Sequence, residues 1–386
     1  MPDPPLRPGV FRVTTAAVTL SLLIAGCSVG GIRRTAPPPG PVSSPAGTTV
    51  EQVPVPVPVP ADHALRQVEF VDAAHGYALF VGPATAGAAV GAAASGGPRS
   101  SAAPGENAVL FGTVDAGRSW RPVRHPRPLA REHQLYAGNG VLVLFAEPDG
   151  WFVSLDAGRS FAHHRRSDTP PAAYRRIYGR LQVCCDTDDR PKVWQWRGDG
   201  FDPLPAQPPL PDLSTVAYGG GRLVAAGLRH GRPYVSVSGD GGRSWSPATA
   251  PDPDGGLFAV RVQVAADGDA WLLGQAGDPT RFPRLWRDFG VPAAPRWLPR
   301  EVADQPAGFT SAVPLGGGLL AVTGPQGPGL VSGGRYARLD WPVGGNHLRM
   351  LDGGTIFAAD PVAGRFWLGT GRGIDRAWTV VRFDRV

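Results

Sequence analysis

The chain has 386 residues, a formal net charge of +6, and 53 glycines and 43 prolines. This length suits one large domain, and so much glycine and proline favours many turns and excludes a fold built on long helices. Lys192 is the only lysine, and the arginines form no basic run interleaved with aromatic residues. The positive charge therefore does not predict a nucleic-acid interface.

The first 26 residues have the organisation of a secretory signal. Arg7 and Arg12 precede an apolar run over residues 13–25, and Cys27 follows the small residues that close this run. The string Ile-Ala-Gly-Cys27 resembles the lipobox of bacterial lipoproteins, which implies cleavage before Cys27 and lipidation of its thiol. The alternative is an ordinary signal peptide with an incidental cysteine. We expect an exported protein, held by lipid on the extracytoplasmic face of the cell membrane.

Two low-complexity segments interrupt the remaining chain. Residues 27–61 are rich in proline, which alternates with valine over 53–60, and such a segment favours an extended stalk without a core. Residues 82–105 are rich in alanine, glycine and serine and predict a flexible insert. The sequence therefore predicts a signal peptide over 1–26, a lipidated stalk over 27–61 and one folded domain over 62–386.

Three segments of the folded domain repeat the pattern D-x-G-R-S followed by Trp or Phe. Its members are Asp115, Gly117, Ser119 and Trp120, then Asp156, Gly158, Ser160 and Phe161, then Asp240, Gly242, Ser244 and Trp245. A short Asp side chain can close a tight turn by accepting backbone N–H groups, and the glycine tolerates a positive φ. We expect the serine hydroxyl to add a second bond to the backbone and the ring to pack between sheets.

The pattern resembles the Asp-box, or bacterial neuraminidase repeat, of sialidase-like β-propellers. The resemblance implies that these aspartates shape hairpin turns and take no part in catalysis. Degenerate copies follow, so that seven centres lie near residues 115, 156, 199, 240, 288, 333 and 375. In addition, residues 68–78 are similar to the start of a photosystem II stability factor-like repeat.

Each unit reads as four short antiparallel strands. Apolar runs joined by glycine turns precede the centres, as in the segments 135–144, 216–225 and 316–322. We therefore predict an all-β fold, a β-propeller of seven four-stranded blades. Six or eight blades and a β-sandwich are the alternatives.

The family resemblance places ligands on the face opposite the Asp-box turns. The loops of that face carry arginines and acids that suit a carbohydrate or an acidic ligand, since guanidinium groups match carboxylates. The candidate residues are Arg127, Arg131, Arg165, Arg166, Asp188, Arg190, Arg229, Arg232 and Arg281.

The sequence offers no catalytic, cofactor or metal residue. Sialidases require a Phe/Tyr-Arg-Ile-Pro segment before the first Asp-box, and the nearest string, 174–178, lies after the second box and lacks the proline. Adjacent pairs such as His163-His164 are poor chelates. Cys184 and Cys185 are either two free thiols or a strained vicinal disulfide.

The sequence favours a monomeric binding module at the membrane surface that performs no chemistry. One alternative is a sialidase-type glycoside hydrolase. A second alternative is an assembly or stability factor for a membrane protein complex. Nucleic acid is not an expected partner.

Overall fold

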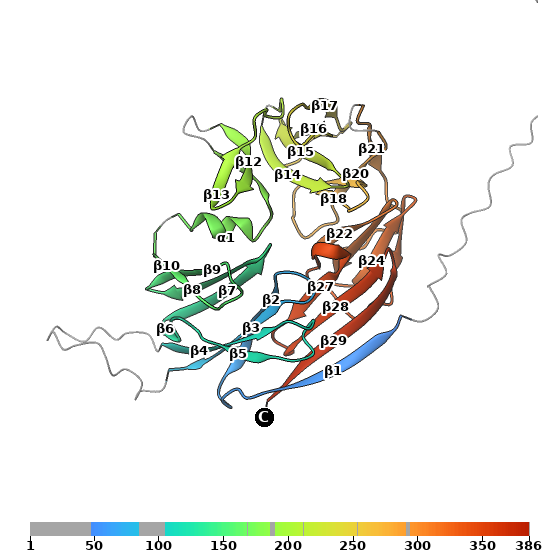
Figure 1. Ribbon diagram of the computed structural model, residues 1–386. Helices are drawn as coiled ribbons and strands as arrows, with labels where there is room; N and C mark the ends of the chain where they lie inside the picture. Colours follow the sequence, from blue (N-terminus) through green and yellow to red (C-terminus); the bar gives the residue numbers. More distant parts are fainter. Residues whose placement is uncertain are drawn as a thin grey trace, which may run out of the picture. The chain divides into compact units, whose positions relative to one another are not determined.

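The computed structural model of the chain describes residues 48–84, 105–167, 169–185, 190–210, 212–252, 254–290 and 294–385. Seven β-sheets follow one another in chain order around a common axis, and together they form a seven-bladed β-propeller (Figure 1). The predicted all-β fold and blade count are therefore confirmed. Cys27 and Asp188, two of the predicted site residues, lie outside the described residues. Among the described residues, no helix has the length and apolar content that a membrane crossing requires.

The blades are antiparallel sheets whose strands are hydrogen-bonded in chain order. Blades 1 and 2 contain β2 (Ala64–Phe70), β3 (Gly76–Pro83), β4 (Glu106–Thr113) and β5 (Arg121–Val123), then β7 (Glu132–Gly138), β8 (Val141–Glu147), β9 (Gly150–Ser154) and β10 (Ala162–Arg165). The short strand β6 (Leu129–Ala130) also pairs with β4. Blade 3 contains β11 (Leu181–Cys185), β12 (Pro191–Arg197) and β13 (Gly200–Pro203), after the helix α1 (Ala172–Arg176).

The remaining four blades continue the same order. Blades 4 and 5 contain β14 (Leu213–Gly219), β15 (Arg222–Arg229), β16 (Arg232–Ser238) and β17 (Ser246–Thr249), then β18 (Ala259–Val264), β19 (Ala270–Gln275), β20 (Arg284–Asp288) and β21 (Trp297–Arg300). Blade 6 contains β22 (Ser311–Gly316), β23 (Leu319–Gly324), β24 (Gly327–Ser332) and β25 (Arg335–Arg338). Blade 7 contains β26 (Arg349–Met350), β27 (Ile356–Asp360), β28 (Arg365–Arg372) and β29 (Asp375–Arg385), with the 3₁₀ turn η1 (Asp352–Gly354) before β27.

A fifth strand, β1 (Val50–Val57), pairs in parallel with β29 at the outer edge of blade 7 (Figure 1). It lies within the segment predicted as a stalk over 27–61, and this prediction is corrected: the folded domain begins before residue 62. Backbone N–H groups along a strand point alternately to either side, and Thr49 O accepts a bond of 2.8 Å from Trp378 N of β29. Because the Thr49 backbone faces β29, the backbone groups of the valines that alternate with the prolines also face β29. The prolines, which lack an N–H, face away from β29.

The alternation that suggested a stalk therefore suits an edge strand. Val55 and Val57 are buried in the core between blades 7 and 1, whereas Pro54 and Pro56 are exposed.

The predicted insert over 82–105 begins later in the structure than expected. Gly82 and Pro83 belong to β3 and pair with the beginning of β4, and residues 85–104 lie outside the described residues.

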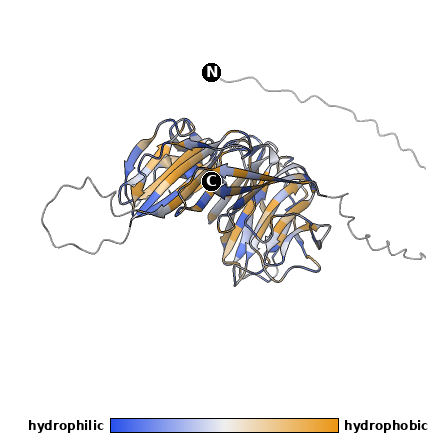
Figure 2. Cartoon of the chain, turned by 90° about the horizontal axis from the view of Figure 1, so that it is seen from below, coloured by the Kyte–Doolittle hydropathy of each residue, from blue (hydrophilic) through white to orange (hydrophobic). Residues whose placement is uncertain are grey.

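The core consists of seven apolar clusters, one between each pair of neighbouring blades. Figure 2 shows the same arrangement as apolar residues running along the strands. Six of the clusters contain strand residues of both blades. The cluster beside blade 3 differs, because there Ile177 and Tyr174, from α1 and its C-terminal end, pack against Val141 and Val143 of blade 2.

The three D-x-G-R-S turns have the same hydrogen-bond network. In the first, Asp115 Oδ1 accepts Ser119 N at 2.9 Å, and Asp115 Oδ2 accepts Ser119 Oγ at 2.6 Å. Thr113 Oγ1 donates to Asp115 Oδ1 and accepts Gly117 N at 3.0 Å. Ser154 and Ser238 take the place of Thr113 in the other two turns. The expected bond from the pattern serine to the backbone is thus corrected: this hydroxyl binds the aspartate, and the earlier hydroxyl binds the backbone.

The aromatic residue of each turn packs against a neighbouring blade. The Trp120 ring lies 5.1 Å from the ring of Phe383 and 6.0 Å from that of Phe366, both in blade 7. Trp245 Nε1 donates to Ala206 O, in the link that follows blade 3, at 3.0 Å. The turns therefore fix the spacing between blades.

Candidate functional site

Most predicted arginines near blades 1 and 2 form ion pairs with acids of neighbouring segments. Arg127 Nε lies 2.8 Å from Asp149 Oδ2, and Arg166 Nη1 lies 2.6 Å from Glu147 Oε1. Arg131 Nη1 lies 3.5 Å from the same Glu147 oxygen. Two carboxylates thus pair with three guanidinium groups, so part of the positive charge near these blades is compensated locally.

The predicted pair on blade 4 differs. Arg229 and Arg232 are direct cross-strand partners on either side of the His230-Gly231 turn, and both are exposed. Like charges directly opposite each other are unfavourable in a sheet, and neither forms an ion pair with a carboxylate in the described part of the chain. An acidic ligand at this hairpin stays a prediction. Arg165, Arg190 and Arg281 are also exposed, on three other blades, and the structure brings no such pair together there.

The Asp-box aspartates are occupied by their turns. Hydrogen bonds from Ser160, then from Ser154, lower the pKa of Asp156 to about 2. The equivalent bonds from Ser244 and Ser238 lower the pKa of Asp240 as well. A carboxylate held ionised by several donors is a poor general acid.

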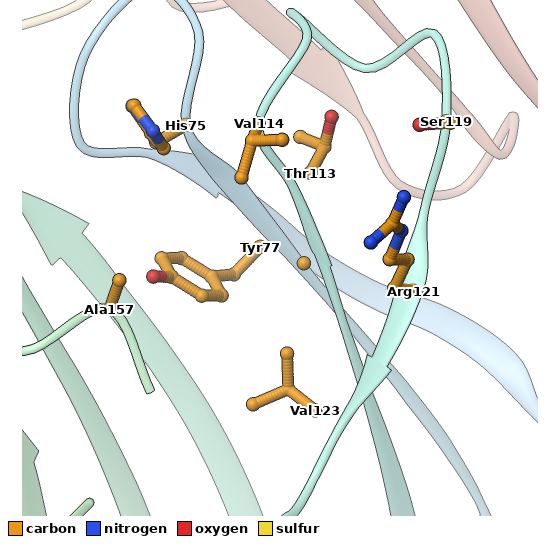
Figure 3. A pocket seen from close by; sticks show the side chains of 9 residues that line it. His75, Tyr77, Thr113, Val114, Ser119, Arg121, Val123 and Ala157 are labelled. Carbon is orange, nitrogen blue, oxygen red and sulfur yellow. The ribbon is translucent and has the colours of Figure 1, made fainter. Parts of the chain in front are cut away.

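A small pocket of about 170 Å³ lies on the Asp-box face between blades 1 and 2 (Figure 3). Burial, followed by the charges of Asp72 and Asp156, raises the pKa of Tyr77 in this pocket to about 12. The volume is below the roughly 300 Å³ of ordinary ligand pockets. It suits the packing of one side chain better than a sugar. The lining residues are His75, Tyr77, Gly112, Thr113, Val114, Ser119, Arg121, Val123 and Ala157.

Blade 3 contains the main departure from the repeat. Its β12–β13 turn is at the predicted centre near residue 199, so β11 and β12 correspond to the second and third strands of the other blades. Among the described residues only three strands form this sheet, and none of them takes the innermost position. In blade 4 the equivalent second strand, β15, is paired on both sides, with β14 and β16.

The second strand of blade 3 is less buried than the second strands of other blades. Residues 222–227 of β15 are all buried, and the second strands of blades 1, 2, 5 and 6 are mostly buried too. In β11 the four residues 181–184 are only half-buried. The side of β11 that faces the propeller axis is thus less covered than in any of these blades.

The helix α1 lies between blades 2 and 3 rather than in the place of the missing strand (Figure 1). Ile177, at its C-terminal end, is buried, and its carbonyl accepts Asn139 Nδ2 of blade 2 at 3.1 Å. On the other side, the guanidinium of Arg176 lies 5.0 Å from the ring centre of Trp196 in β12. Arg175 Nη1 lies 3.2 Å from Cys184 Sγ, and Cys184 is a free thiol. The helix therefore covers one face of blade 3 and leaves the inner edge of β11 uncovered.

Exposed tyrosines flank this inner edge. Tyr178, just after α1, is 67% exposed, and Tyr218 near the end of β14 is 62% exposed. Tyr178 also lies within electrostatic reach of Glu69 on β2, the inner strand of blade 1. Tyr178 is therefore placed toward the axis. Large exposed aromatic side chains are typical anchors of binding surfaces.

A tyrosine and carboxylate cluster adjoins this region. Glu69 binds Arg349 Nη1 at 2.7 Å, and burial nevertheless raises the pKa of the Glu69 carboxyl. Burial, followed by the neighbouring Tyr174, raises the pKa of Tyr136 to about 12. The Tyr174 and Tyr178 hydroxyls lie 3.0 Å apart. The raised pKa keeps the Tyr136 hydroxyl neutral, which suits hydrogen bonding and not nucleophilic attack.

Sequence reasoning missed this region because the third unit was taken as a regular blade. A signal was present: Pro170-Pro171 is followed by Ala-Ala-Tyr-Arg-Arg, a helical string with proline before it, in place of an apolar run with a glycine turn. No group of three or more His, Cys, Asp or Glu side chains that could hold a metal occurs in the described part of the chain.

No protein-family model matches the sequence, and no curated protein matches it. Solved structures similar to this chain include YCF48 from Cyanidioschyzon merolae, with 13% identity, 83% of this chain and 96% of that chain covered, and a TM-score of 0.40. YCF48 bound to a D1 peptide has 13% identity, coverage of 81% and 90%, and a TM-score of 0.39. The β-propeller domain of Cps50 (Swd1) from Myceliophteria thermophila has 11% identity, coverage of 69% and 89%, and a TM-score of 0.36. These likenesses concern the fold alone.

Proposed function

We propose that this protein is an exported, lipid-anchored β-propeller that binds a partner protein and catalyses no reaction. The observation that carries the proposal is the opening at blade 3, where the half-buried strand β11 follows the exposed Tyr178 in the chain and packs beside β14, which carries the exposed Tyr218. Aromatic side chains beside an uncovered apolar strand are features of protein interfaces. The proposed anchor is Cys27, by its resemblance to the lipobox.

The titratable groups favour binding over catalysis. A sialidase-type reaction needs a tyrosine that readily ionises, whereas burial raises the pKa of Tyr136 to about 12. Glu69 is paired with Arg349, and the Asp-box carboxylates are held by hydroxyl and amide donors. We therefore expect no turnover of sialosides or aryl-glycosides.

Peptide selection on the full-length chain tests the proposal. Random dodecapeptides displayed on phage are selected on the immobilised protein, and binding of the selected peptides is measured for the double variant Tyr178→Ala/Tyr218→Ala. We expect their affinity to fall by about tenfold or more, since anchor residues contribute about 2 kcal/mol or more. Leu155→Ala/Val362→Ala, at two exposed apolar residues elsewhere, is the matched control and should leave affinity unchanged.

Two results would contradict the proposal. The first is the absence of any selected peptide whose binding depends on the tyrosines. The second is hydrolysis of a sialoside or aryl-glycoside that a substitution of Glu69 abolishes.

A further inference from the structure

The inner edge of β11 carries backbone groups without a partner. Trp196 N donates to Arg180 O at 2.8 Å, which sets the phase of the β11–β12 ladder. In this phase Gln182 and Cys184 direct their backbone groups to β12, and Leu181 and Val183 direct theirs to the opposite side. No other described strand pairs there, and the Leu181 and Val183 backbones form no hydrogen bond to another described residue on that side.

A strand edge of this kind is a template for another strand. In blade 4 the same edge is filled by β14, whose residues from Leu213 to Tyr218 pair with β15. The five residues of β11 span about 17 Å, which is enough for four or five residues of an added strand. Edges left unpaired in folded proteins are either protected or used to bind extended segments.

Positive charge on the α1 side of blade 3 points to an acidic segment: Arg175 lies beside Cys184 of β11 and over the Phe201 ring of β13, and Arg176 lies over the Trp196 ring of β12. Arg175, Arg176 and Arg180 lie within six residues of each other, and none forms an ion pair with a described carboxylate. The Nε groups of Arg175 and Arg176 are buried without a hydrogen-bond partner. Burial, and then the charge of Arg180, lowers the pKa of Arg176. Carboxylate side chains on a bound segment would supply the missing acceptors and reduce this repulsion.

We infer that the free edge of β11 binds an extended acidic segment of a partner protein as an added β-strand, which completes blade 3 between Tyr178 and Tyr218. This inference rests on the proposed partner binding and specifies its mode. The segment takes the position that the innermost strand has in the other blades. Its backbone binds Leu181 and Val183, and its acidic side chains face the arginines at the end of α1 and just after it.

The test compares Val183→Pro with Val183→Ala in the full-length chain, using the peptides selected on phage. Proline removes the Val183 N–H that faces the free edge without removing a bond to β12, and proline is tolerated at such positions. Alanine removes the same side chain but keeps the N–H. We expect Val183→Pro to weaken peptide binding by about tenfold relative to Val183→Ala, since the hydrogen bond is lost and the pyrrolidine ring obstructs the added strand.

A second measurement avoids any change in the protein. Each selected peptide is synthesised in two forms. One form carries N-methyl groups on the odd-numbered residues, and the other carries them on the even-numbered residues. In an added strand the N–H groups of every second residue point toward β11. The form methylated at those residues should lose binding, and the other form should keep it. The selected peptides should also be rich in Asp and Glu, and their Lys-substituted forms should bind at least about tenfold more weakly.

The outcomes separate this inference from the proposed function. Peptides that depend on the tyrosines but bind Val183→Pro and Val183→Ala equally, and tolerate both N-methyl phases, would overturn strand addition and leave partner binding standing. Failure to select any peptide would overturn both. Slow amide exchange at Leu181 and Val183 in the chain alone would mean that another part of the chain covers the edge, which also overturns the inference.

Discussion

Blades 3 and 4 are neighbours built from the same repeat, but only one of them is complete. Blade 4 has four strands, an Asp-box turn with its full set of bonds at Asp240, and a second strand buried over residues 222–227. Blade 3 has three strands, a degenerate turn at Asp199, and a second strand that is half-buried. The difference teaches that one blade can lose its inner strand within a closed ring; a degenerate motif is not sufficient for this, because blades 5, 6 and 7 also lack the full D-x-G-R-S pattern and have four antiparallel strands.

The loss of the inner strand in blade 3 does not disrupt the ring, because other contacts join blade 3 to its neighbours. The helix α1 replaces part of the contact between blades 2 and 3, and the cluster around Leu204 and Leu213 joins blades 3 and 4. The ring therefore stays continuous although one inner strand is missing. A propeller can in this way expose one sheet edge without losing its other six interfaces.

The largest effect is expected for Ile177→Ala. Ile177 is 7% exposed and holds α1 against blade 2, so its truncation should lower the free energy of unfolding by about 2–5 kcal/mol. Thermal unfolding measures this loss. Arg180→Ala, at an exposed residue beyond the helix, is the control. An Ile177→Ala protein as stable as wild type would show that α1 does not support blade 3.

A matched pair of valines sharpens the comparison. Val224 of β15 is fully buried, whereas Val183 of β11 is half-buried, although both lie in the second strand of their blades. Val224→Ala should cost about 1.5–3 kcal/mol and Val183→Ala less than about 1 kcal/mol, as measured by urea unfolding. Equal costs would mean that the inner edge of blade 3 is as well covered as that of blade 4.

The turns should differ in their response to acid. Hydrogen bonds from Ser244 hold the pKa of Asp240 below its usual range, so the stability that this carboxylate provides is complete above about pH 4 and is lost as pH falls through the lowered pKa. Asp240→Asn should therefore lower the melting temperature at pH 7, and the difference from wild type should shrink at a pH well below about 4.

Asp199 provides the control for this experiment. It accepts no hydrogen bond from any described residue, so Asp199→Asn should leave the melting temperature unchanged at both pH values. A loss for Asp199→Asn equal to that for Asp240→Asn would contradict the division between motif-bearing and degenerate blades.

The sequence was sufficient for the fold because the repeat is local. Each D-x-G-R-S turn closes within seven residues, so Asp115, Asp156 and Asp240 could be assigned from spacing alone, and the decayed centres followed from the period. The exclusion of β1 from the predicted fold has a different cause. Alternating Val and Pro suit either a solvated stalk or an edge strand, and only the pairing with β29, distant in sequence, decides between them.

The candidate site could not be predicted for a related reason. The opening at blade 3 results from a strand that is absent, and a repeat search looks for what recurs. The described arginines of the predicted set are exposed, but Arg127 and Arg166 form ion pairs with Asp149 and Glu147, which lie 22 and 19 residues away along the chain. Such pairing depends on how neighbouring loops meet in space.

Amide hydrogen exchange of the full-length chain, alone and with a selected peptide, tests the central claim most directly. In the chain alone, the amides of Leu181 and Val183 should exchange rapidly, while that of Gln182 and those of β15 exchange slowly. With the peptide bound, Leu181 and Val183 should become protected and β15 should not change. Slow exchange at Leu181 and Val183 before the peptide is added, or no added protection after it, would contradict the account.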